Sequence, residues 1–325
     1  MLSFFKTNNP AVVLLYVPYM VLLRLFFLKS NIAYPEPQIP AEPFSQLVFG
    51  WIGNSSLLLI LCGAIVQFIQ ALLINGLVNQ NKMTARKTYL PGLIYLLLTS
   101  MLPENLLLSA PMLGFAFVLG AVSNVFQLAK KEKMNGALYD AGFLMGMAAL
   151  FHLPYLVLFV FLYLSLGSVR AIVVREWIVA LLGFVTPVFL VFTVYFVADW
   201  PAPAFYSTGL FGLGAISTVQ KIGLGVIAFF SVMTLAGIQG ALYSAVIQVR
   251  KFTTILLSLF VLVAISFFLQ ERVSMAHLMG LLVPVSVIGA MILVQVKRWW
   301  IAEVLHIILL LLVLALQWLP LFNII

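Results

Sequence analysis

Carboxylates are scarce in this chain, and five of them fall in polar connectors that we assign to one side of a membrane: Glu36, Glu42, Glu104, Asp199 and Glu271. Carboxylates that converge from separate connectors could act as general bases or hold a metal ion. The plainer interpretation is that connectors need polar residues to meet water, and that these acids do only that. A divalent cation is thus a candidate cofactor, but the sequence does not identify one.

Cations and an imidazole occur on the same side of the chain. Arg24 lies about one turn from the outer end of the first apolar run, Lys221 and Arg272 lie in outer connectors, and His277 follows closely. These four residues are candidates for binding a phosphate or a lipid headgroup, since cations neutralise such groups. For Arg24 there is a simpler alternative, in which its long stem lets the guanidinium snorkel to the headgroups.

Compact catalytic signatures are missing from the sequence. It contains no H-E-x-x-H, G-x-S-x-G or P-loop motif and no Cys/His cluster. Cys62 is the single cysteine, so no internal disulfide can form. The net charge is +8, but the basic residues form no stripe with interleaved aromatic residues. The pattern therefore argues against a nucleic-acid partner.

The elements that must position these residues are membrane-spanning helices. Hydrophobic residues make up 64% of the chain and charged residues only 8%, whereas soluble domains have about 25% charged residues. Apolar runs of about 20 residues, enough to cross a membrane as helices, recur from end to end. We predict an all-α polytopic bundle of about 11 spans, at residues 10–28, 46–78, 88–101, 106–128, 135–151, 153–168, 177–198, 221–249, 252–269, 274–296 and 301–322.

The basic residues predict how the bundle is oriented. If the N-terminus is inside, 13 of the 17 lysines and arginines fall in cytoplasmic connectors, as the positive-inside rule requires. We therefore predict that the N-terminus is inside and the C-terminus outside. We expect residues 1–325 to form a single integral membrane domain with no soluble domain, in a bacterial inner membrane.

Several runs have unusual lengths. Run 46–78 would extend about 50 Å as one helix, so the G-N-S-S sequence at 53–56 predicts a break. Run 221–249 is also too long, and we expect a kink near Gly237 and Gly240. The runs at 88–101 and 135–168 are cramped and could re-enter the membrane, which would keep Glu104 below the outer surface.

Small residues recur at helical spacing in the run at 135–151. Ala137, Ala141, Gly142 and Gly146 would lie on one side of a helix. Small residues at this spacing allow another helix to approach closely. We interpret them as a packing seam.

Residues 1–170 resemble the polytopic glycosyltransferases of the GT-C superfamily, which use lipid-phosphate-linked sugars. The resemblance rests on an acidic first outer connector, the segment P-F-S-Q-L-V-F-G-W, the acid in T-S-M-L-P-E-N, and Y-D-A-G-F-L-M-G-M-A-A-L-F-H-L-P. It implies that Glu36 or Glu42 stands at the first-loop catalytic acid and Glu104 at the second-loop acid. Residues 171–325 would be additional transmembrane helices.

Three functions compete on these observations. The first is a transferase that uses a sugar on polyprenyl phosphate at the outer face of the membrane. The second is a non-catalytic subunit or scaffold of a cell-envelope complex, with other membrane chains as partners. The third is a lipid flippase or transporter. Membrane lipids are partners in every case. A pocket that joins the acids would favour the enzyme, and a polar path through the midplane would favour transport.

Overall fold

The computed structural model describes residues 5–6, 9–29, 42–53, 55–130, 135–169, 173–200, 217–243, 245–270, 274–296 and 298–318. Within these ranges the chain is helical and contains no β-strand. The elements are η1 (Pro10–Leu15), α2 (Tyr16–Lys29), α3 (Pro43–Ile52), α4 (Ser56–Gln80), α5 (Leu90–Thr99), η2 (Pro103–Leu106), α6 (Ala110–Leu128), α7 (Asn135–Phe151), η3 (Leu153–Leu158), α8 (Phe159–Val169), α9 (Val174–Val197), α10 (Thr218–Ala236), α11 (Ile238–Tyr243), α12 (Ile247–Phe267), η4 (Met275–Leu278), α13 (Met279–Gln295) and α14 (Trp299–Trp318).

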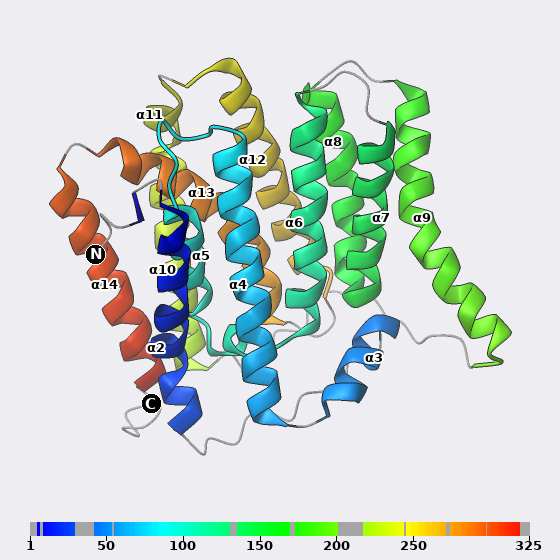
Figure 1. Ribbon diagram of the computed structural model, residues 1–325, viewed down its shortest axis with the longest axis horizontal. Coiled ribbons are helices and arrows are strands. Elements are labelled where there is room, and N and C mark those ends of the chain that lie inside the picture. The colour runs from blue at the N-terminus through cyan, green and yellow to red at the C-terminus, as the bar shows by residue number, and fades with distance from the viewer. Residues whose placement is uncertain are drawn as a thin grey trace.

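Seven of the described helices are long and apolar enough to cross a membrane, and three further apolar helices are shorter. The all-α membrane bundle expected from the sequence is therefore present (Figure 1). The number of spans, near 11, and the side on which each terminus lies stay predictions. The long helices run roughly side by side, and α9 diverges from the others towards one end (Figure 1).

Both expected breaks in the overlong runs are present. The first falls where α3 ends at Ile52 and α4 begins at Ser56, and Gly53 adopts φ +64° at this point. A positive φ suits glycine because it has no Cβ. The second break is at Gly237, which separates α10 from α11. Each long run is thus divided into one long helix and one short helix.

The centre of the bundle is formed by α5 and α13, and both pack against α4. Every residue of α5 is buried. Polar side chains of α4 point into this centre and bond to neighbouring helices. The Gln70 Nε2 donates to the Met112 carbonyl (2.8 Å) and the Asn75 Nδ2 donates to the Tyr16 hydroxyl (2.9 Å). Such interhelical hydrogen bonds hold helices together where apolar packing competes with lipid.

The seam of small residues on α7 lies where α7 packs between α6 and α9. Ala141 is fully buried. A Cβ added at Gly142 would collide with the carbonyl of Ala180, and one at Gly146 would collide with the carbonyl of Phe184. Glycine at these positions lets the backbones of α7 and α9 approach closely.

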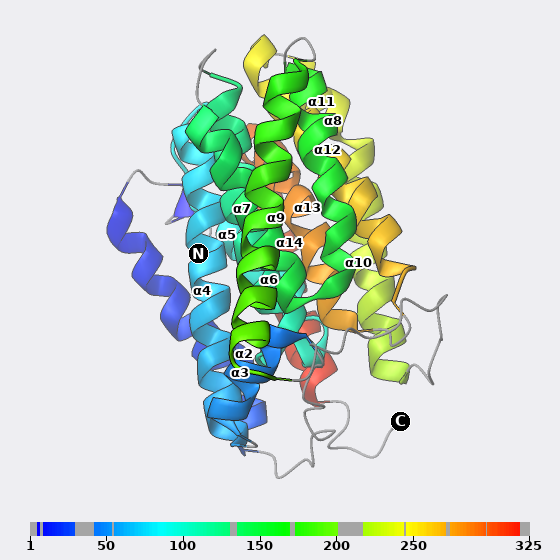
Figure 2. The same ribbon diagram turned by 90° about the vertical axis from the view of Figure 1, so that its right-hand side faces the viewer.

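Three 3-10 helices gather at one end of the bundle, which we call the η end. Here η2 joins α5 to α6, η3 joins α7 to α8, and η4 joins α12 to α13 (Figures 1 and 2). Helix α3 lies at the same end and packs against α7, while η2 packs against η4. Pro103 and Pro154 lie in the first turns of η2 and η3, where a missing N–H costs little. Side chains from distant parts of the sequence therefore meet at the η end.

Candidate functional site at the η end

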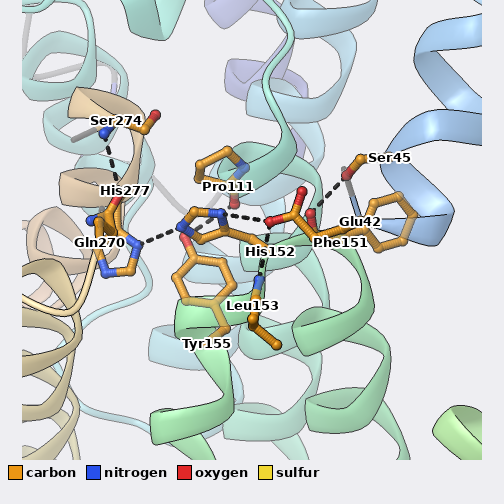
Figure 3. A network of polar contacts seen from close by, with 10 residues as sticks. All are labelled: Glu42, Ser45, Pro111, Phe151, His152, Leu153, Tyr155, Gln270, Ser274 and His277. Carbon is orange, nitrogen blue, oxygen red and sulfur yellow. Dashed lines mark hydrogen bonds and ion pairs between the residues drawn. The ribbon is translucent and has the colours of Figure 1, made fainter. Parts of the chain in front are cut away.

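Four buried side chains form a continuous polar chain at the η end, which we call the histidine chain: Glu42, His152, His277 and Ser266. The Oε1 of Glu42 lies 3.9 Å from Nδ1 of His152. The Nε2 of His152 is 3.0 Å from Nδ1 of His277, and the Nε2 of His277 is 2.8 Å from the Ser266 hydroxyl. Figure 3 shows the acid and both imidazoles in line.

Each member comes from a different connector or helix end. Glu42 is the residue before α3, His152 lies between α7 and η3, His277 is in η4, and Ser266 is near the end of α12. The Ser45 hydroxyl donates to the Phe151 carbonyl (2.7 Å), which fixes α3 beside the end of α7 (Figure 3). This bond holds Glu42 next to His152.

Hydrogen-bond directions couple the two imidazoles. Ser266 donates to the Val263 carbonyl (3.0 Å), so its oxygen is free to accept from an Nε2–H of His277. The Nδ1 of His277 is then an acceptor, and His152 must donate to it through Nε2–H. This arrangement leaves a lone pair on Nδ1 of His152 facing Glu42. The opposite arrangement reverses every bond and places an N–H towards Glu42.

The two arrangements differ by one proton at Glu42 and by the tautomer of both rings. A proton can therefore be exchanged between Glu42 and the pair of imidazoles. Ser266 is fully buried and donates to a main-chain carbonyl, so that end of the histidine chain offers no exit for a proton. The imidazoles thus give Glu42 a titratable neighbour, as at a positioned general base. Tyr155 closes one side of the histidine chain, with its ring 4.9 Å from each imidazole and its hydroxyl donating to Pro111 (Figure 3).

Burial shifts the acid–base behaviour of the two members that lie outside the helices. Glu42 is 4% exposed and His152 is 8% exposed. Burial raises the pKa of the Glu42 carboxyl above its ordinary value of 4.5. Burial, together with the neighbouring His277, lowers the pKa of His152 well below its ordinary value of 6.5. Both shifts favour neutral groups, because a charge is costly where water is excluded.

An apolar groove begins directly beside Glu42. It has a volume of about 290 Å³ and is lined by side chains of α3, α7 and α9 together with Trp200. Pro43 and Phe44, the two residues after Glu42, form part of its wall. On α9 the wall includes Pro187, which lies inside that helix. The shape and lining suit a hydrocarbon chain.

A second polar group lies at the η end, and we call it the Arg24 cluster: Arg24, Gln67 and Asn105. Arg24 is 3% exposed, and its Nη2 donates to Oε1 of Gln67 at 2.6 Å. The Nε2 of Gln67 donates to the Asn105 carbonyl, also at 2.6 Å. The guanidinium therefore points at α4 rather than outwards to a headgroup, unlike the snorkelling alternative. Its Nε and Nη1 have no hydrogen-bond partner.

The other predicted site residues have separate surroundings. Glu104 is half-buried and accepts a hydrogen bond from Gln220, while its Oε2 is buried without a partner. Lys221, next in the chain, is exposed. Glu36 and Arg272 lie outside the described residues. Thus Glu42 and His277 come together in one network, and Glu104 shares no bonding partner with them.

Metal ligation at this end is limited by the number of ligands. The facing nitrogens of His152 and His277 could hold a transition metal only with further donors. Among the residues that the structure describes, no group of three or more His, Cys, Asp or Glu side chains could bind a metal. A hydrogen-bonded pair of imidazoles with a carboxyl 3.9 Å away is the arrangement that these residues support.

Sequence reasoning selected Glu42 and His277 but missed their partners. His152 and His277 both occur near outer ends of apolar runs, and that shared position was the available signal for pairing them. Ser266 and Gln67 gave no signal, because single polar residues inside apolar runs usually serve helix packing.

No model of a known protein family matches this chain, and no curated protein or solved structure matches it either.

Proposed function

We propose that the chain is a membrane-embedded transferase that takes a sugar from a polyprenyl-phosphate donor at the outer face of the membrane, with Glu42 as its general base. The observation that carries the proposal is the position of Glu42. This acid is buried, lies beside His152, and directly precedes two residues of the apolar groove. A prenyl chain in the groove would bring its phosphate towards the η end.

The reaction uses one proton transfer and one substitution. In its ionised form Glu42 takes the proton of an acceptor hydroxyl while the hydroxyl oxygen bonds to the anomeric carbon of the sugar. The raised pKa of Glu42 makes its carboxylate a stronger base once it is ionised. The bond from that carbon to the phosphate oxygen breaks, and the polyprenyl phosphate leaves with the bonding electrons. His152 is a positioning residue: its Nδ1 lies 3.9 Å from the Glu42 carboxyl, and the N–H of the next residue, Leu153, donates to the same carboxyl oxygen (3.4 Å).

Glu42 is the preferred base among the acids that the sequence singled out, because it has an acid–base partner. Glu104 has a different role: its Oε2, which has no hydrogen-bond partner, would contact the sugar donor. Its element η2 packs against η4, which carries His277. The two acids therefore act on the same end of the bundle from different sides.

The groove also supports a second candidate, a non-catalytic subunit that seats the helix of another membrane protein. Apolar walls formed by α3, α7 and α9 suit a helix as well as a lipid. Transport is less well supported. The buried amides of Gln70 and Asn75 on α4 bond within the bundle, which is typical of packing rather than of a pathway.

Turnover by the purified protein tests the transferase. The full chain in nanodiscs would be given a panel of polyprenyl-phosphate hexoses, and release of polyprenyl phosphate would be followed by mass spectrometry. We expect Glu42→Gln to abolish release and Glu104→Gln to raise the KM for the donor. Glu176→Gln, at the first turn of α9, is the control that should leave release unchanged. Full activity of Glu42→Gln, or no release from any donor, would overturn the proposal.

The outer-face part of the proposal has its own test. In a Cys62→Ala background, single cysteines at positions 38 and 205 should react with an impermeant thiol reagent in intact cells. A cysteine at position 132 should react only after lysis, because the basic connectors are expected inside. The reverse pattern would place the η end in the cytoplasm.

A further inference from the structure

Arg24 is a buried cation that no carboxylate of the described residues neutralises. Its side chain is 3% exposed, and among the described residues it forms no ion pair. Its one hydrogen bond goes to a neutral amide, the Oε1 of Gln67. The N–H groups on Nε and Nη1 have no acceptor. A guanidinium in this state is costly inside a membrane protein, and such residues usually mark functional sites.

Among the described residues, the polar groups around Arg24 supply no counter-charge. The side-chain oxygen of Gln67 accepts from Arg24, and its Nε2 donates to the Asn105 carbonyl. The amide of Asn105 donates to the Thr99 carbonyl (3.0 Å). Glu104 follows η2's first residue and is bonded to Gln220 on α10. The Oδ1 of Asn105 and the Oε2 of Glu104 have no hydrogen-bond partner, and neither atom bonds to the Arg24 guanidinium.

We propose that the Arg24 cluster binds a phosphate-class anion. The free donors lie on two different nitrogens of the guanidinium, so an anion with several oxygens fits them better than a single carboxylate oxygen. Arg24 lies in the C-terminal half of α2, and Gln67 links it to Asn105 of η2 at the η end, where we expect the phosphates of one lipid leaflet to lie. The phosphate could belong to a lipid headgroup or be free in solution. The inference does not rest on the transferase, since binding needs no turnover.

Thermal unfolding of the full chain can measure this binding. Purified protein would be compared in phosphatidylcholine nanodiscs, in nanodiscs that also contain phosphatidic acid, and in neutral detergent with inorganic phosphate. We expect phosphatidic acid to raise the Tm of the parent protein. Arg24→Met should weaken the apparent affinity about tenfold or more, because charge-assisted hydrogen bonds are lost. Arg175→Met, which removes an exposed guanidinium at the start of α9, is the matched control and should bind like the parent.

Comparison of the two probes identifies the source of the bound phosphate. A Tm shift with inorganic phosphate alone identifies free phosphate as sufficient, and a shift only with phosphatidic acid identifies the lipid headgroup; either supports the site. No shift with either probe overturns it, as does an equal shift in Arg24→Met. Glu104→Gln tests an internal counter-charge: if it unfolds more easily and gains phosphate binding, Glu104 neutralises Arg24 and the proposal is wrong. Arg24→Lys, which keeps the charge, covers the case in which Arg24→Met fails to fold.

Discussion

The histidine chain and the Arg24 cluster are both buried at the η end, but they meet the cost of burying polar groups in different ways. In the histidine chain each imidazole nitrogen faces another member, and the pKa shifts of Glu42 and His152 favour neutral groups. The guanidinium of Arg24 has one neutral partner and two nitrogens with none. A network that is internally satisfied can hold a proton, whereas one that is left incomplete is suited to an outside ligand.

The comparison predicts its largest effect in the histidine chain. His277→Ala should lower the free energy of unfolding by roughly 2–4 kcal/mol, because it opens a cavity and removes the acceptor of His152. Chemical unfolding in detergent would measure the loss. His306→Ala is the matched control, since His306 is also buried but bonds to a single side chain, Tyr19. Equal losses in the two variants would mean that the hydrogen bonds of the histidine chain add no stability beyond the burial of an imidazole ring.

A substitution in the packing seam of α7, outside both regions, provides a reference for these changes in the free energy of unfolding. Gly142→Leu should cost about 1–3 kcal/mol, because the new side chain meets the backbone of Ala180 on α9. Gly136→Leu on the same helix has open space at its Cβ and should unfold like the parent. Neither change should alter the effect of phosphatidic acid on Tm. If Gly142→Leu melts with the parent, the α7–α9 contact is not tight.

For Arg24 the comparison predicts that substitution increases stability, which is the opposite of the effects above. In lipid-free neutral detergent, Arg24→Met should raise the free energy of unfolding by about 1–2 kcal/mol, because a buried unpaired charge is replaced by an apolar chain of similar length. The gain should shrink or vanish when phosphatidic acid is present. A stability loss without lipid would show that Arg24 is already compensated, and the contrast between the two regions would fail.

The smallest effect is a dependence on pH. The folded-state pKa of Glu42 is raised, so its contribution to stability is present below about pH 4.5 and is lost as the pH rises through the folded pKa. The pKa of His152 is lowered, so its contribution is present above about pH 6.5 and is lost as the pH falls. Glu42→Gln should therefore lose less stability than the parent when the pH is raised. Parallel pH profiles of the two proteins would show that Glu42 does not titrate as described.

The sequence by itself determined the class of protein and the positions of most helices. Long apolar runs with few charges leave a helix as the way to satisfy the backbone in a membrane, and the G-N-S-S break and Gly237 could be read from local residue types. It also selected Glu42, His277 and Arg24, because charged or polar side chains at the ends of apolar runs are conspicuous.

Only the tertiary structure decided which of these residues meet. Residues 42, 152 and 277 are far apart in sequence, and nothing local encodes that η3 and η4 pack near the start of α3. Glu104 looked like a partner of Glu42, yet its neighbour is Gln220. Arg24 looked able to snorkel, yet its side chain lies against Gln67. Hydropathy fixes how deep a helix lies in the membrane, but side-chain pairing depends on rotation and packing between helices, which apolar runs leave undetermined.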